Sequence, residues 1–105
     1  MPNQKELCAV GRFAKRQSFL VHKWKPTLFP GLFDIGVVVS FGKLIPKSII
    51  KAFPYGMINV HGSLLPNLRG AAPVERAIES GYKTTGVTVI EVSFRDDCVF
   101  EEIYM

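Results

Sequence analysis

A run of apolar residues at 34–41 limits most strongly what this chain can fold into. The run reads Asp-Ile-Gly-Val-Val-Val-Ser-Phe, so β-branched side chains fall on both sides of an extended backbone. A near-continuous run of this kind is typical of a parallel strand that is buried on both faces. Gly42 follows it directly and favours a tight turn from strand to helix.

Helix and strand patterns alternate along the chain. Apolar residues recur at helical spacing near the N-terminus, with basic residues on the opposite face, which predicts an amphipathic helix. Pro46 and Pro73 are each suited to the first turn of a helix, and Gly81 to a helix C-terminus. The expected elements are a helix at 5–17, a short strand at 19–22, the strand at 34–41, a helix at 46–53, a strand at 57–61, a helix from Pro73 to Gly81 and a strand at 85–92.

This alternation predicts βαβ units, and hence an α/β fold with a doubly wound, mainly parallel sheet. A chain of 105 residues with 48% hydrophobic content can form one small domain and not two. No repeat or low-complexity segment interrupts it. The sequence therefore predicts a single small α/β domain.

Composition limits the partners and cofactors that we expect. Cys8 and Cys98 are far apart and have no neighbouring His or second Cys, so the sequence indicates neither a metal site nor a disulfide framework. The longest apolar stretch is too short to span a bilayer, and we expect no membrane partner. The net charge of +4 and the pI near 9.3 fit a nucleic-acid partner without requiring one.

Asn59 and His61 are the strongest candidates for chemistry. They stand two residues apart at the end of a predicted strand, so they share one face, roughly 6–7 Å apart. An amide donor and a protonated imidazole together suit the stabilisation of a developing oxyanion. The alternative is a strand end where both side chains cap backbone groups, and the spacing alone does not separate the two.

Four spaced segments resemble the folate-dependent formyltransferases, and within them the branch that formylates methionyl initiator tRNA. The resemblance extends from about residue 8 to about residue 92. The segments are Ser-Phe-Gly-Lys-Leu-Ile-Pro at 40–46, Asn-Val-His-Gly-Ser-Leu-Leu-Pro at 59–66, Arg-Gly-Ala-Ala-Pro at 69–73 and Thr-Gly-Val-Thr at 85–88. The resemblance implies a Rossmann-like formyltransferase fold and transfer of a formyl group from formyl-tetrahydrofolate to the amino group of methionyl-initiator tRNA, in support of translation initiation.

The resemblance also assigns roles to residues. Asn59 would donate a hydrogen bond to the formyl oxygen, and protonated His61 would stabilise the charge on it. The implied folate-binding residues are Gly42, Lys43, Leu44, Ile45, Ser63, Leu64, Leu65 and Pro66. Ligands of open parallel sheets bind outside the carboxyl ends of the strands, where both segments fall. For the apolar members of this set, an ordinary place in the hydrophobic core is the alternative.

The chain departs from the family after residue 92. The family has a catalytic Asp followed by a Gly beyond its Thr-Gly-Val-Thr strand, whereas this chain has no Asp-x-Gly there. Asp97 is the formal candidate for that role, and an accidental match is the alternative. The family's first strand and C-terminal domain have no counterpart here. We therefore expect a partial catalytic domain at 1–92, incomplete at both ends and impaired in activity, and a divergent tail at 93–105.

Two other functions stay open on the sequence. A formyltransferase acting on a sugar amine or a nucleotide would carry the same Asn-x-His core. A non-catalytic remnant of the fold is the alternative outside the enzymes. The Phe-Pro-Tyr-Gly segment at 53–56 resembles mitochondrial members of the family, so we expect a mitochondrial protein, or a cytoplasmic one if it is bacterial.

Overall fold

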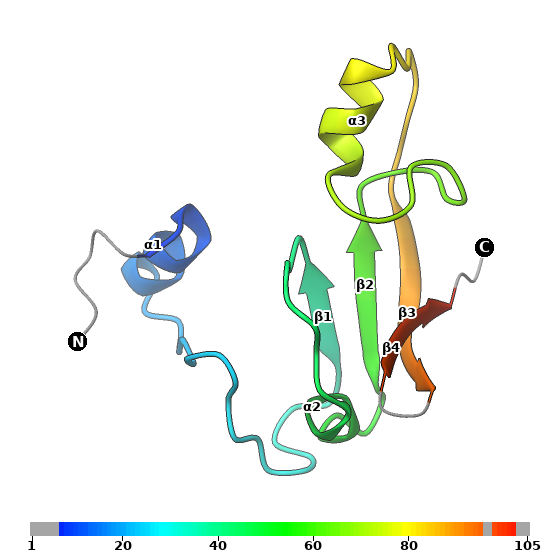
Figure 1. Ribbon diagram of the computed structural model, residues 1–105. Helices are drawn as coiled ribbons and strands as arrows, with labels where there is room; N and C mark the ends of the chain where they lie inside the picture. The colour runs from blue at the N-terminus through cyan, green and yellow to red at the C-terminus, as the bar shows by residue number, and fades with distance from the viewer. Residues whose placement is uncertain (1–6, 96–97, 103–105) are drawn as a thin grey trace.

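The computed structural model describes residues 7–95 and 98–102, and its centre is a four-stranded sheet with the strand order β1-β2-β3-β4 (Figure 1). The elements are α1 (Ala9–Arg16), β1 (Gly36–Val39), α2 (Lys47–Lys51), β2 (Met57–His61), α3 (Pro73–Glu79), β3 (Thr88–Arg95) and β4 (Cys98–Glu102).

The unit β1-α2-β2 confirms the predicted βαβ arrangement. β1 and β2 are parallel, with Gly36 opposite Met57 and Val39 opposite Val60. The valines of the 34–41 run form β1, and the predicted strand at 57–61 is β2 to the residue. The carboxyl ends of both strands therefore meet at one edge of the sheet, where α3 and the loop before it also lie (Figure 1).

The hydrophobic core lies between α2 and one face of the sheet. Ile49 and Ile50 of α2 pack with Ile45, Met57 and Val92, and all five side chains are buried. Burial of such side chains contributes about 1.5–3 kcal/mol each. The core therefore packs around the amino-terminal end of β2 and leaves its carboxyl end to the loops.

The strand expected at 85–92 forms β3, but the prediction of a parallel direction for it is wrong. β3 runs antiparallel to β2, with His61 opposite Thr88, and β4 runs antiparallel to β3. A parallel strand needs a connection that returns to the amino end of the sheet. α3 instead stands beyond the carboxyl end of β2, so the chain enters β3 from that end (Figure 1). β3 also continues past residue 92, and the division of the chain at that point stays a prediction.

The N-terminal region differs most from expectation. The helix predicted at 5–17 is α1, which buries none of its residues: Val10 is 76% exposed and Phe13 51%. The prediction of a strand at 19–22 is wrong, because these residues form no strand. Phe19, Leu20 and Val21 are exposed. An isolated extended segment without a partner strand leaves its backbone groups to water. α1 lies apart from the sheet and joins it through an extended segment (Figure 1).

α3 ends as predicted at a glycine in the left-handed region. Gly81 has φ +71°, its N–H donates to the Ile78 carbonyl at 3.1 Å, and the Tyr82 N–H donates to the Ala77 carbonyl at 3.0 Å. This is a Schellman motif, in which glycine avoids the Cβ penalty of positive φ.

Gly81→Ala is expected to lower the free energy of unfolding by about 1 kcal/mol, because alanine in this conformation is strained. The urea midpoint of the variant, compared with that of Ser80→Ala one residue earlier, measures the effect. Equal midpoints for Gly81→Ala and the unmodified chain would contradict the assignment.

No helix within the described ranges 7–95 and 98–102 is long and apolar enough to cross a membrane.

Candidate active site

An open cavity of about 510 Å³ lies at the carboxyl ends of β1 and β2. Its lining comes from the ends of both strands and from the segment that leads into α3. The lining residues are Ser40, Phe41, Gly42, Asn59, Val60, His61, Gly62, Gly70, Ala71, Ala72, Pro73, Val74 and Glu75. Three of the four segments that the sequence singled out therefore meet at one place.

Asn59 and His61 reach this cavity from β2. They are two residues apart in the strand, so their side chains leave the same face of the sheet. Asn59 lies opposite Ile90 and His61 opposite Thr88. Ile90 is 1% exposed, which identifies this face as the core face. Asn59 and His61 thus continue the core face of β2 beyond Met57 and line the open cavity at the carboxyl end of the strand.

His61 is held by a backbone acceptor. The side chain is 7% exposed, and Nε2–H donates to the Leu68 carbonyl at 3.0 Å. A carbonyl only accepts hydrogen bonds, so this contact assigns a proton to Nε2. Nδ1 is then the nitrogen whose protonation decides the charge of the ring.

The loop after β2 is fixed by two hydroxyl groups. Ser63 is fully buried, and its Oγ donates to the Asn67 carbonyl at 2.7 Å. The Thr88 hydroxyl donates to the Ser63 carbonyl at 2.7 Å and accepts from the Leu65 N–H at 3.1 Å. Thr88 belongs to β3, so the sheet itself holds the loop that carries the Leu68 carbonyl.

Gly86 explains a further part of the pattern. A Cβ atom at this position would stand 2.6 Å from Cδ2 of Leu64, which is closer than side-chain atoms approach. Glycine therefore lets the Leu64 side chain lie close to the backbone just before β3, and the Thr-Gly-Val-Thr segment supports the loop through both its glycine and its last threonine.

Backbone strain gathers around the cavity. Ser40, Leu68 and Ala72 have φ values of +50°, +56° and +53° without being glycine. Such conformations cost about 1–3 kcal/mol and persist where the surroundings enforce them, often at functional sites. Ser40 and Ala72 line the cavity, and Leu68 supplies the acceptor for His61.

Arg76 is a site residue that the sequence reasoning missed. Its Nη1 donates to the Arg69 carbonyl at 2.6 Å and lies 3.5 Å from the Ala71 carbonyl. The side chain thus ties α3 to the loop at the cavity rim. The acceptors are backbone groups, which leave no mark on the sequence, so no pattern signalled this contact.

The predicted folate-binding residues divide into two groups. Gly42 lines the cavity and the other seven lie outside its lining. Ile45 and Leu65 are buried, as the core alternative expected, and Ser63 is buried through its hydrogen bond. Leu44 is 82% and Leu64 50% exposed, which leaves two apolar side chains accessible. Lys43 and Pro66 are exposed.

Asp97 lies outside the described residues. Among the described residues, Glu75 at the start of α3 is the carboxylate that lines the cavity. Within the same ranges, no group of three or more His, Cys, Asp or Glu side chains is arranged to hold a metal ion. The cavity is lined by the Asn59 amide, the oriented His61 imidazole and backbone groups at the ends of β1 and β2. This combination suits stabilisation of an oxyanion that forms at a carbonyl carbon.

Comparison with known proteins gives one family. The family model described as formyl transferase matches residues 25–97. A mitochondrial methionyl-tRNA formyltransferase from Rattus norvegicus is 42% identical over 83 residues, which are 79% of this chain and 21% of the relative. The methionyl-tRNA formyltransferase of Buchnera aphidicola is 53% identical over 64 residues, which are 61% of this chain and 20% of that protein.

A solved structure supports the fold. Glycinamide ribonucleotide transformylase 1 from Geobacillus kaustophilus superposes with a TM-score of 0.50 and 23% identity, over 90% of this chain and 46% of that one. It confirms the expected Rossmann-like α/β class. This chain spans about a fifth of the length of the curated relatives that it matches.

Proposed function

The chain belongs to the formyl transferase family, and we propose that it transfers a formyl group from formyl-tetrahydrofolate to the amino group of methionyl-initiator tRNA. The observation that carries this proposal is the placement of Asn59 and His61 on one strand face at the open cavity. The relatives named methionyl-tRNA formyltransferase, at 42% and 53% identity, support the choice of acceptor.

In the proposed reaction the amine nitrogen attacks the formyl carbon. A new carbon–nitrogen bond forms, and the carbonyl oxygen becomes an oxyanion. Asn59 donates its amide N–H to that oxygen, and the His61 ring stabilises the same charge when Nδ1 is protonated. When the intermediate collapses, the bond to the folate nitrogen breaks. The proton lost by the attacking amine passes to the folate nitrogen. Removal of one oxyanion donor typically costs about 3 kcal/mol of barrier.

We place the folate ring against the segments 42–45 and 63–66. Gly42 lines the cavity, and the exposed side chains of Leu44 and Leu64 offer apolar surface to a flat ring. The second segment is held by Thr88, so its backbone is preorganised for binding. Asp97 is proposed as the carboxylate that orients His61 and takes part in proton transfer.

We also propose a mitochondrial location. Both mitochondrial and bacterial proteins are among the relatives, but the match to the mitochondrial protein of Rattus norvegicus extends over 79% of this chain and that to the Buchnera protein over 61%.

A formyl-transfer assay tests the acceptor. The protein is incubated with formyl-tetrahydrofolate and, in parallel, with methionyl-initiator tRNA, with a sugar amine and with an amino nucleotide. We expect formylation of the charged tRNA alone. Formylation of one of the small acceptors in its place would replace the proposed substrate, and no transfer to any acceptor would favour the non-catalytic remnant.

A further inference from the structure

Positive charge is concentrated at one end of this chain. Residues 7–33 contain five Lys or Arg and no Asp or Glu. Because the whole chain carries +4, and Lys5 and Glu6 cancel, the part from residue 34 onward carries −1. The five cations are Arg12, Lys15, Arg16, Lys23 and Lys25, and all of them are exposed. We call residues 9–25 the basic arm.

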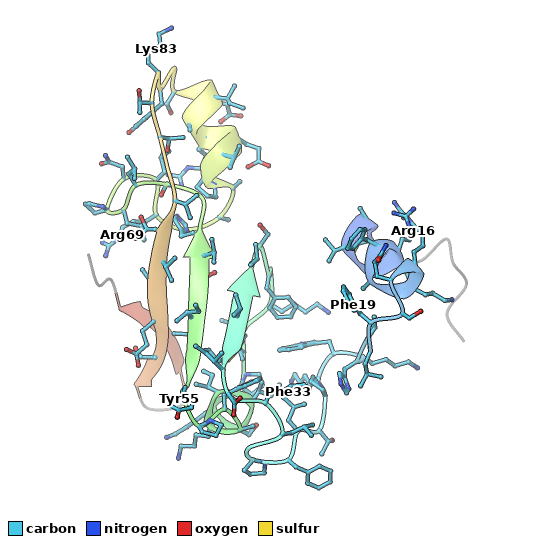
Figure 2. The ribbon with its side chains drawn as sticks, turned by 180° about the vertical axis from the view of Figure 1, so that it is seen from behind. Arg16, Phe19, Phe33, Tyr55, Arg69 and Lys83 are labelled. Carbon is cyan, nitrogen blue, oxygen red and sulfur yellow. The ribbon has the colours of Figure 1, made fainter. Side chains whose placement is uncertain are left out.

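The basic arm presents its charges in order. In α1, Arg12, Lys15 and Arg16 stand at positions i, i+3 and i+4, so they share one helix face, with Phe13 beside it and Val10 opposite. Lys23 and Lys25 continue the series in the extended segment that follows. The arm stands apart from the sheet, with Arg16 and Phe19 in the separated part (Figure 2). The surface of this separated part is therefore accessible.

Aromatic rings alternate with these cations. Phe13 is 51% and Phe19 62% exposed. Exposed aromatic rings between basic side chains form the surface on which proteins bind single-stranded nucleic acid, because bases stack on the rings while the cations contact phosphates.

The arm is joined to the cavity. The ring of Trp24, near the end of the arm, meets the ring of Phe41 edge to face, with centroids 4.6 Å apart. Phe41 lines the cavity in which Asn59 and His61 lie. A polyanion that lies along the arm therefore ends beside the candidate active site.

We propose that the basic arm binds the single-stranded RNA next to the reacting amino group. The charges and rings of the arm indicate a single-stranded nucleic acid as the partner. The identification of that RNA as the end of a tRNA rests on the proposed function. The arm is a poorer fit to an anionic membrane. α1 has eight residues, with Val10 and Phe13 as its large exposed apolar side chains, and two of the five cations lie outside the helix.

Binding is measured by fluorescence anisotropy of the full chain with an RNA stem-loop that carries a single-stranded 3′ tail and no attached amino acid. Five phosphate contacts on a single strand predict a slope of about −3.5 for log affinity against log salt, and hence a roughly 100-fold loss from about 50 to 200 mM salt. The double variant Lys15→Gln with Arg16→Gln should bind at least about tenfold more weakly at low salt, with a slope smaller by about 1.4.

Lys51→Gln with Lys83→Gln is the matched control, since it removes the same charge from exposed positions outside the arm. It should bind within about twofold of the unmodified chain. Phe19→Leu should weaken binding to the tailed RNA about tenfold and leave a blunt stem-loop unaffected.

Equal losses in the two double variants, or an affinity independent of salt, would overturn the proposal. So would tighter binding to vesicles of phosphatidylserine and phosphatidylcholine than to the tailed RNA, because the arm would then be a membrane surface. The readout needs no catalysis. RNA binding that behaves as expected in a protein that formylates no acceptor would overturn the proposed function and leave the arm as an RNA surface.

Discussion

Replacing His61 by alanine is expected to lower the turnover of formyl transfer by at least about 100-fold, and Asn59→Ala to lower it by a similar factor. Both side chains act on charge that appears mainly in the transition state, so the loss should fall on kcat more than on KM for the folate. Steady-state kinetics with formyl-tetrahydrofolate and charged tRNA measure both constants. Far-ultraviolet circular dichroism and the urea midpoint check that each variant is folded.

His22→Ala is the matched control, because His22 is the other histidine of the chain and is exposed in the connecting segment. It should leave turnover unchanged. His61→Gln separates charge from hydrogen bonding, since an amide can donate to the Leu68 carbonyl but carries no positive charge. We expect it to be nearly as slow as the alanine variant. Turnover near that of the unmodified chain in Asn59→Ala or His61→Ala would remove these residues from the chemistry.

The parts of the fold that were predictable are those where local pattern and tertiary packing agree. Met57 to His61 was predicted as a strand and forms β2, and the run at 34–41 contains β1. Pro73 opens α3, and Gly81 follows its last turn in the conformation that glycine favours. For β2 and α3, the residues that define the element also fix its ends.

Strand direction and strand partners were not predictable in the same way. The alternation of elements is identical whether β3 runs parallel or antiparallel to β2, and the direction depends on where α3 ends in space. Residues 19–22 have the composition of a strand, but no described segment pairs with them. A strand is stable only when a neighbouring strand pairs with it, and the sequence of one segment does not show whether such a neighbour exists.

The sequence predicted those parts of the candidate site that side chains form. Asn59 and His61 were found because their spacing in a strand puts them on one face. The supports of the site are backbone groups: the Leu68 carbonyl accepts from His61, and the Arg69 carbonyl accepts from Arg76. Any residue type has a carbonyl, so these contacts leave no compositional signal. Composition also does not separate Leu44 from Ile45. The two residues are similar in type and adjacent in sequence, but Leu44 is 82% exposed and Ile45 7%.

Thr88→Val is expected to lower the free energy of unfolding by about 2–4 kcal/mol while keeping the β-branched shape that suits β3. The reason is the double role of the hydroxyl, which accepts from the Leu65 N–H and donates to the Ser63 carbonyl. Without it both partly buried backbone groups lose their partner, and each such loss costs about 1–3 kcal/mol.

The effect should be local as well as global, because the same hydroxyl anchors the loop that holds His61 through Leu68. Amide hydrogen exchange at Leu65 should therefore accelerate more than at Val92 in the buried core. Thr88→Ser keeps the hydroxyl and should retain most of the stability, and Thr85→Val makes the same chemical change at an exposed position. If Thr88→Val melts in urea like Thr85→Val and leaves exchange at Leu65 unchanged, then Thr88 does not anchor the loop, and the Thr-Gly-Val-Thr segment shapes the site through Gly86 and Leu64 alone.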